Sequence, residues 1–175
     1  MLSTGLAYVT TSGRGSADAL LGEVAHHLTK AGWHLGGVIQ TNTEYHPDRP
    51  CHMDLQVLGT RRVVRISQFL GEGSKGCRLD PQGLETAVAL VEADLAQRRP
   101  DLIVLNKFGK HEGDGRGFRP VIAEALGAGI PVLTAVSALN LARFQDFAGN
   151  LATALPDDAA SVLRWCVQHR VTGEA

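Results

Sequence analysis

The chain has 175 residues with 17 basic and 18 acidic side chains, which gives a formal net charge of −1. This balance lacks the basic excess expected of a nucleic-acid-binding protein or of a protein that binds anionic membranes. A chain of this length buries roughly two-thirds of the surface of its unfolded form, so we predict a single domain over residues 1–175.

Three cysteines cannot all pair within one chain, and the sequence contains neither a signal peptide nor an apolar run of about 18 residues. We therefore expect a reduced, cytoplasmic protein that does not span a membrane. Aromatic residues make up only 5% of the chain, whereas Ala, Leu, Val and Gly are plentiful. This composition favours helices packed closely on a sheet over a sandwich of two sheets.

The first third of the chain alternates between strand-like and helix-like patterns. Residues 6–11 predict a buried strand, which is followed by a glycine-rich turn and by a helix from Ser16 that ends at Gly32. Residues 34–40 predict a second strand. Residues 41–50 contain two prolines and no periodicity, so we expect a loop there.

The pattern changes where two β-rich runs, residues 53–58 and 62–67, flank a Gly59-Thr60 turn and predict an inserted hairpin. Further elements are predicted by apolar spacing and by Pro and Gly stops: helices at 81–99, 118–126 and 156–169, and strands at 102–105 and 131–136. Residues 138–155 show a mixed pattern that predicts no element. Short connections require right-handed crossovers, so we predict an α/β fold, a mostly parallel sheet with helices on both faces and an inserted β-hairpin.

Polar residues crowd the segment after the strand at 102–105, and we expect any chemistry to lie there, because open α/β sheets bind ligands at the carboxyl ends of their strands. We place this segment in a loop. The polar residues of this segment are Asn106, Lys107, Lys110, His111, Glu112, Asp114 and Arg116. Asn106-Lys107 also matches the start of a guanine-reading NKxD signature, but Gly109 stands where its aspartate belongs.

The glycine-rich turn after the first strand is a second candidate, because backbone amides at such a turn make an anion site at the start of a helix. Its amides, hydroxyls and one cation come from Ser12, Gly13, Arg14, Gly15 and Ser16. Asp18 favours the opposite interpretation, since a carboxylate in the first turn already stabilises the helix dipole and repels a second anion.

The order of these elements resembles that of a small P-loop nucleoside-triphosphatase family first known from thermophiles and of the molybdopterin-guanine dinucleotide biosynthesis adaptor. The phrases CHMDL, ISQFLGEGSKGCRLDP, LNKFGKHEGDGRGF and IPVLTAV are more closely similar to an uncharacterised bacterial family of unknown function that is loosely linked to molybdenum genes. The resemblance covers nearly the whole chain. It implies a P-loop-like fold and a role in molybdenum or metal-cofactor metabolism.

The residues that a working P-loop needs are replaced in this chain. A P-loop carries a lysine for the β/γ-phosphates and a hydroxyl for Mg²⁺, and Ser16 and Ala17 stand at those positions. By the same comparison Asn106 stands in place of the magnesium-directing aspartate, and Lys107 follows it. Neither residue attracts a hard cation.

We therefore predict a protein that binds a nucleotide, a phosphate or a metal oxyanion such as molybdate or tungstate, with a degenerate P-loop and no rapid hydrolysis. The alternative is a nucleoside-triphosphatase or phosphoryl-transfer enzyme. In that enzyme Arg14 and Lys107 would clamp the phosphates and Glu112, which matches the family's acidic loop position, would position water.

Cys51, His52 and Cys77 include ligand types suited to a soft or borderline metal, and we retain them as candidate metal ligands. Their spacing fits no zinc motif, and cysteines are also common as small buried hydrophobic residues. Both interpretations stay open. Small α/β domains of this kind are often symmetric, so we expect a homo-oligomer, most simply a dimer.

Overall fold

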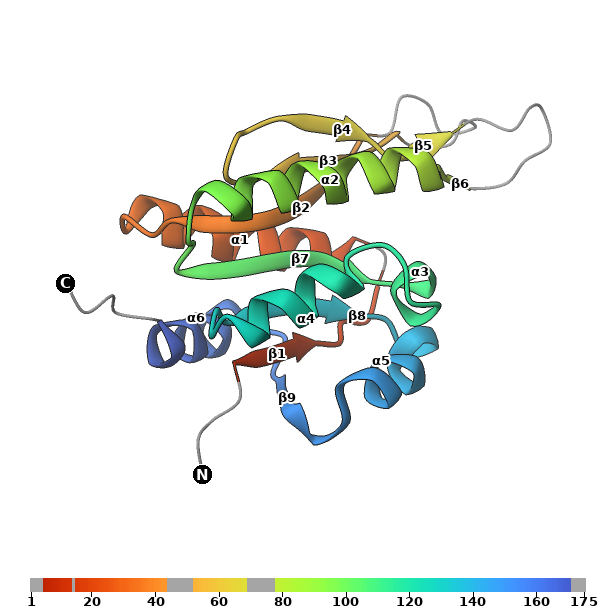
Figure 1. Cartoon of the computed structure of the whole chain (residues 1–175). Helices are drawn as coiled ribbons and strands as arrows, with labels where there is room; N and C mark the ends of the chain where they lie inside the picture. Colours follow the sequence, from red (N-terminus) through yellow and green to blue (C-terminus); the bar gives the residue numbers. More distant parts are fainter. Residues whose placement is uncertain (1–4, 14, 44–51, 69–77, 171–175) are drawn as a thin grey trace.

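The computed structural model of the protein describes residues 5–13, 15–43, 52–68 and 78–170. Its main sheet has seven strands, shown in Figure 1. Their order across the sheet is β4 (Val63–Arg65), β3 (His52–Val57), β2 (Leu35–Thr43), β7 (Leu102–Phe108), β8 (Val132–Val136), β1 (Leu6–Val9) and β9 (Ala152–Leu155). Two shorter strands, β5 (Ser67–Gln68) and β6 (Arg78–Leu79), pair separately.

Neighbouring strands from β2 to β9 run parallel, whereas β3 and β4 are antiparallel. The predicted mostly parallel α/β sheet is therefore confirmed, and so is the hairpin. The hairpin extends the main sheet, because β3 pairs with β2 along six residue positions from Val38–Val57 to Thr43–His52.

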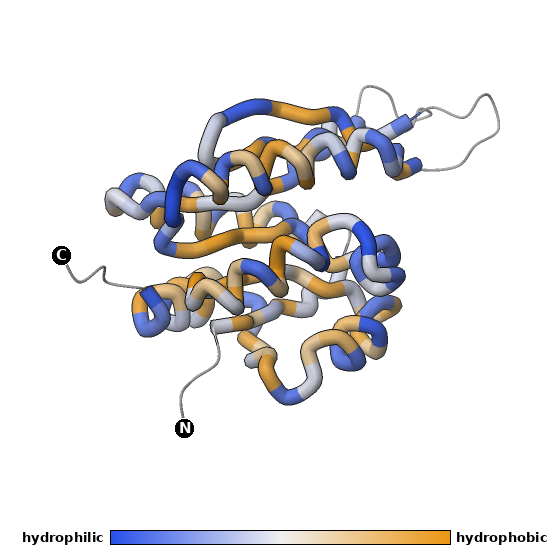
Figure 2. The backbone as a smooth tube through the Cα atoms, viewed as in Figure 1, coloured by the Kyte–Doolittle hydropathy of each residue, from blue (hydrophilic) through white to orange (hydrophobic). Residues whose placement is uncertain are grey.

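Helices cover both faces of the sheet, as predicted. Their bounds are α1 (Ser16–Lys30), α2 (Pro81–Gln97), α3 (Lys110–Gly113), α4 (Arg119–Gly127), α5 (Leu141–Ala148) and α6 (Ala159–His169), with 3₁₀ turns η1 (Ala138–Asn140) and η2 (Gly149–Leu151). Helices α1 and α6 share one hydrophobic cluster with the sheet, and α2, α4 and α5 share the other. Figure 2 shows hydrophobic residues along β7, between these layers. No helix in the described parts of the chain is both long and apolar enough to span a bilayer.

Local rules account for the start of α2. The side chain of Asp80 accepts a hydrogen bond from the backbone N–H of Gln82, and Pro81 occupies the first helical position. A carboxylate cap satisfies one of the free N–H groups at a helix start, and proline has no N–H to satisfy. This boundary agrees with the prediction from the Asp-Pro pair.

Three strands of the main sheet differ from the expectation, and the short strands β5 and β6 were not predicted. Strand β2 continues to Thr43, into the predicted loop, because the first residues of β3 pair with its end. Strand β7 includes Asn106 and Lys107, which we expected in a loop, and its register with β8 shifts between Leu105 and Phe108. Strand β9 was not predicted, because it is a half-exposed edge strand with a weak apolar signal.

Parallel strands bring three chemically interesting segments to one edge of the sheet. The turn after β1, the end of β2 and the segment after β7 all lie at the carboxyl edge, where Figure 1 shows α3 and α5. Helix α1 leaves β1 for one face of the sheet, and α5 follows the neighbouring β8 onto the other. Such a reversal opens a crevice in which α/β proteins hold ligands.

Close contact between β2 and β7 depends on Gly37. Its φ of 93° lies in the left-handed region, and a Cβ at this position would overlap the carbonyl oxygen of Val104. We expect Gly37→Ala to lower the free energy of unfolding by about 3 kcal/mol, because strained backbone and overpacking act together. Urea denaturation measures the change.

Gly22→Ala is the matched control for this substitution. Gly22 lies inside α1, and nothing lies within 4 Å of a Cβ added there. Alanine is the better helix former, so this variant should gain about 0.5–1 kcal/mol. A Gly37→Ala protein with the wild-type urea midpoint would contradict the close approach of the two strands.

Candidate functional site

A cavity of about 420 Å³ lies at the carboxyl edge of β2 and β7, and we call it the β7 cavity. Its polar lining comes from β2, β7 and the α3 segment: Gln40, Asn106, Lys107, Lys110, His111 and Glu112. Its apolar lining comes from the other elements around it: Met53, Leu55, Ile66, Leu79, Leu84 and Phe118. The volume lies within the ~300–1,000 Å³ range of small-molecule sites.

Asn106 is the most unusual residue in this lining. The residue is 2% exposed, and neither the oxygen nor the nitrogen of its carboxamide has a hydrogen-bond partner among the described residues. The hydroxyl of Thr134 donates to the carbonyl oxygen of Leu105, next to Asn106, at 2.7 Å, and the Asn106–Lys107 peptide bond is cis. Buried polar groups are nearly always hydrogen-bonded, so an unpartnered carboxamide marks a candidate ligand contact.

Glu112 holds the segment between β7 and α4 in place. The residue is 3% exposed, and its two carboxylate oxygens accept hydrogen bonds from the backbone N–H of Gly109 at 2.9 Å and of Phe118 at 3.3 Å. Burial raises the pKa of this carboxyl above its usual value, and the two backbone N–H groups and nearby His111 partly oppose that effect. The same segment is held at Gly117, whose N–H donates to the side chain of Glu85.

The cations at this site are exposed. Lys107 and Lys110 line the cavity with exposed side chains, and neither forms an ion pair within the part of the chain that the structure describes. Glu112 is the single carboxylate among the described lining residues, and backbone N–H groups occupy both of its oxygens. The site therefore offers positive charge at the solvent side and an unpartnered amide inside.

The glycine-rich turn lies at a second cavity of about 380 Å³, which we call the α1 cavity and which Gly15 and Asp18 line. Gly13 and Gly15 have φ values of 97° and 79°, and the hydroxyl of Ser16 donates to the carbonyl oxygen of Ser12 at 3.0 Å. Gly15 caps α1 without a side-chain hydrogen bond. The turn thus holds two glycines in the left-handed region, while the hydroxyl of Ser16 is used inside the turn.

Asp18 changes the electrostatics of the α1 cavity. One of its carboxylate oxygens accepts a hydrogen bond from Asn42 at 2.8 Å, and the other is buried with no partner in the described chain. Asn42 in turn accepts a hydrogen bond from Gln40, which lines both cavities. A carboxylate oxygen without a donor repels a bound anion, so the α1 cavity is the less favourable anion site.

The predicted site residues are therefore divided between two places. Asn106, Lys107 and Glu112 meet in the β7 cavity, whose apolar lining belongs to the cluster under α2 and α4. Gly15 lies at the α1 cavity, where Ile39 packs against the cluster under α1 and α6. The two cavities thus lie on opposite faces of the sheet, with the end of β2 between them.

Three of the predicted residues, Arg14, Cys51 and Cys77, lie outside the described residues. His52 begins β3 and pairs in register with Thr43. Within the described ranges, no group of three His, Cys, Asp or Glu side chains is arranged to hold a metal ion. The metal-ligand assignment of Cys51, His52 and Cys77 stays a prediction.

Sequence reasoning missed Gln40 and the apolar side of the β7 cavity. The sequence signal for Gln40 is weak: it is a polar residue two positions after Val38 on a strand that is otherwise apolar there. In the structure Gln40 is only 8% exposed. The sequence gives no signal for Leu55, Ile66 and Leu84, because an apolar residue that lines a cavity cannot be distinguished by sequence from one packed in the core.

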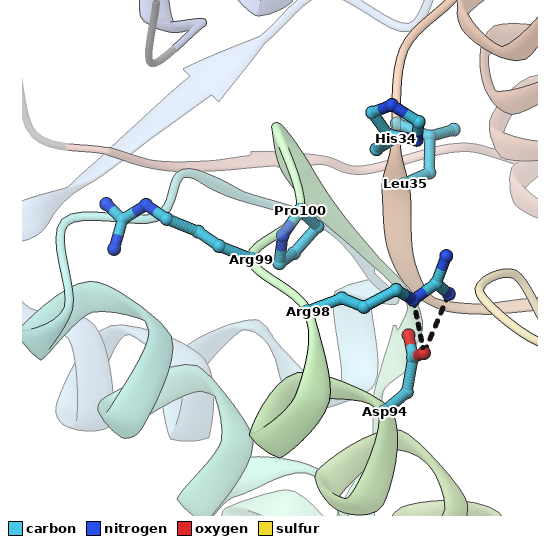
Figure 3. A pocket seen from close by; sticks show the side chains of 6 residues that line it. All are labelled: His34, Leu35, Asp94, Arg98, Arg99 and Pro100. Atoms are coloured by element: carbon cyan, nitrogen blue, oxygen red, sulfur yellow. Dashed lines mark hydrogen bonds and ion pairs between the residues drawn. The ribbon is translucent and has the colours of Figure 1, made fainter. Parts of the chain in front are cut away.

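A third cavity of about 200 Å³ lies at the opposite, amino edge of β2 and β7, beside His34 and Pro100 (Figure 3). Its carboxylate, Asp94, is already paired with Arg98 at 2.7 Å, and Arg98 also donates to the carbonyl oxygen of Gly59. Figure 3 shows Arg98 turned toward Asp94 and Arg99 pointing away. These contacts join the end of α2 to the hairpin turn, and we assign them a structural role.

The cost of the unpartnered carboxamide can be measured with Asn106→Leu. Leucine has a similar shape and leaves no polar group unpaired, so we expect the free energy of unfolding to rise by about 1–3 kcal/mol. Gln40→Leu is the control, because it removes the bond to Asn42 and should cost about 1 kcal/mol. A less stable Asn106→Leu protein in thermal and urea denaturation would mean that the carboxamide has a partner.

The raised pKa of Glu112 predicts a pH dependence of stability. The folded state binds the proton of Glu112 more tightly than the unfolded state does. The stability that this gives the folded state is complete below the usual pKa of 4.5 and is lost as the pH rises through the folded pKa. The stability difference between wild type and Glu112→Gln should therefore shrink above pH 4.5, by about 1.4 kcal/mol for each pH unit of the raised interval. Urea denaturation between pH 4 and 8 would measure it, with exposed Glu124→Gln as the charge control. A difference that grows with pH would contradict the assignment.

Comparisons with known proteins place the chain in a family. It is 39% identical over 150 residues, or 85% of its length, to the molybdenum import ATP-binding protein ModC 2 of Bradyrhizobium diazoefficiens. The match spans only 16% of that protein's length. No solved structure matches the chain. A family described as protein of unknown function (DUF2478) matches residues 6–165, and the chain belongs to that family.

Proposed function

We propose that the protein binds a nucleotide, a phosphate or a metal oxyanion at the carboxyl edge of its sheet and does not hydrolyse it rapidly. The observation that carries this proposal is the pair of exposed lysines, Lys107 and Lys110, at a cavity whose single described carboxylate is already hydrogen-bonded to two backbone N–H groups. Charged hydrogen bonds from such lysines to an anion are among the stronger polar contacts in proteins.

The residues at the former P-loop positions support binding over hydrolysis. Ser16 donates its hydroxyl to the backbone of Ser12, and Ala17 has no oxygen to hold a phosphate-bound Mg²⁺. At the end of β7, Asn106 and Lys107 bring no negative charge to attract that ion. The side chains that align and activate phosphates in P-loop enzymes are thus replaced.

The similarity to a molybdenum import ATP-binding protein supports two ligand classes, a nucleotide and an oxyanion such as molybdate. The matched part is a small share of that protein, so its ATP-binding role describes the whole relative and is here an inference for this chain. We infer a role connected with molybdenum or a metal cofactor. A symmetric homo-oligomer remains part of the proposal.

A phosphoryl-transfer enzyme is the second candidate, and the shared cavity of Lys107 and Glu112 favours it. Its weakness is that both Glu112 oxygens accept backbone hydrogen bonds, which leaves a water molecule only a poorly accessible acceptor. Phosphate release from ATP or GTP that disappears in both Glu112→Gln and Lys107→Ala would select this enzyme. Release no faster than in buffer would exclude it.

Anion binding can be tested by calorimetric titration of the purified protein with phosphate, molybdate and ATP. We expect at least one of them to bind, and we expect Lys107→Ala and Lys110→Ala each to weaken it roughly 10-fold, since a charged hydrogen bond contributes about 1.5–3 kcal/mol. Chelation of divalent cations should leave the affinity unchanged. Added salt should weaken it.

Lys30→Ala is the control for these two variants. Lys30 lies in the last turn of α1, at the amino edge of the sheet, and its side chain is exposed. Its removal changes the net charge by the same amount and should leave the affinity unchanged. A well-folded protein that binds none of the three probes would overturn the proposed function.

A further inference from the structure

We infer that the β7 cavity binds a purine nucleotide, with the base inside against Asn106 and the phosphates outside at Lys107 and Lys110. This inference rests on the proposed function and names the ligand class and its orientation. It differs from binding at the glycine-rich turn, which lies at the α1 cavity on the other face of the sheet.

The apolar lining is the first step of the argument. Leu55, Ile66, Leu84 and Phe118 are between 1% and 6% exposed, and all four border the cavity. A small inorganic oxyanion placed against them would lose hydration and gain no hydrogen bonds in return. The lining therefore fits a ligand with a large apolar or aromatic part, and the volume of about 420 Å³ fits an organic molecule.

The carboxamide of Asn106 restricts the chemistry of that aromatic part. Both its oxygen and its nitrogen are buried and unpartnered in the described chain, so the complementary ligand presents a donor beside an acceptor. A carboxamide binds the N6 and N7 atoms of adenine in this bidentate way. Purines combine such an edge with an apolar aromatic face, as the lining requires.

The distribution of charge sets the orientation. Asn106 is 2% exposed, whereas Lys107 and Lys110 are exposed residues of the same lining. Phosphates at the lysines keep much of their hydration, while the base takes the dry interior. Glu112 is the single carboxylate among the described lining residues, and its two oxygens already accept hydrogen bonds from Gly109 and Phe118.

The test compares ATP and GTP with tripolyphosphate, which carries the phosphates without the base, by calorimetric titration of the full chain. At least one of the two purine nucleotides should bind roughly 10-fold or more tightly than tripolyphosphate, because a bidentate contact to a base contributes about 1–3 kcal/mol. Asn106→Leu should abolish that preference and leave tripolyphosphate binding unchanged. Lys107→Ala should weaken the binding of both ligands.

Amide NMR spectra locate the bound nucleotide, and Asn106→Ala serves as a second variant if Asn106→Leu does not fold. Nucleotide should shift the signals of Gly109 and Phe118 more than those of Gly13 and Ser16. The opposite pattern would overturn the inference. So would phosphate or molybdate that binds as tightly as the nucleotide and is unaffected by either Asn106 variant, a result that would leave the proposed function standing. Absence of binding by every probe would instead overturn the proposed function.

Discussion

The polar side of the β7 cavity depends on the buried carboxylate of Glu112. By accepting hydrogen bonds from Gly109 and Phe118, this one side chain joins the end of β7 to the start of α4. Lys110 and His111 lie on the short helix between these two anchors, so their positions follow from it. A buried carboxylate is costly to desolvate, and here backbone N–H groups offset that cost.

Much of the fold could be predicted because buried parallel strands and the helices between them carry strong local patterns, as at residues 102–105 and at Asp80-Pro81. The errors arose where distant pairing decides the structure. Thr41–Thr43 form strand only because β3 pairs beside them, and β9 depends on β1 for its one neighbour in the main sheet. A local window of sequence does not reveal either partner strand, β3 for the end of β2 or β1 for β9.

The candidate site divides in the same way. Asn106, Lys107 and Glu112 could be selected because polar residues at the end of a buried strand stand out from their neighbours. The two opposed cavities could not be predicted, since they depend on which face of the sheet each side chain meets. The pairing of Asp18 with Asn42 likewise joins residues far apart in the chain, and the second Asp18 oxygen, which has no donor in the described chain, makes the glycine-rich turn a poor anion site.

On the proposed function, an unpartnered amide inside the protein also ties the lifetime of the molecule to the ligand that it binds. A ligand that pairs with Asn106 adds free energy to the folded state alone, by about 2.7 kcal/mol at 100 times its dissociation constant. Because proteases cleave the unfolded chain, protein molecules with bound ligand would be degraded more slowly than those without it. On the proposed function, the cellular supply of the ligand would then govern the abundance of the protein with no dedicated regulator.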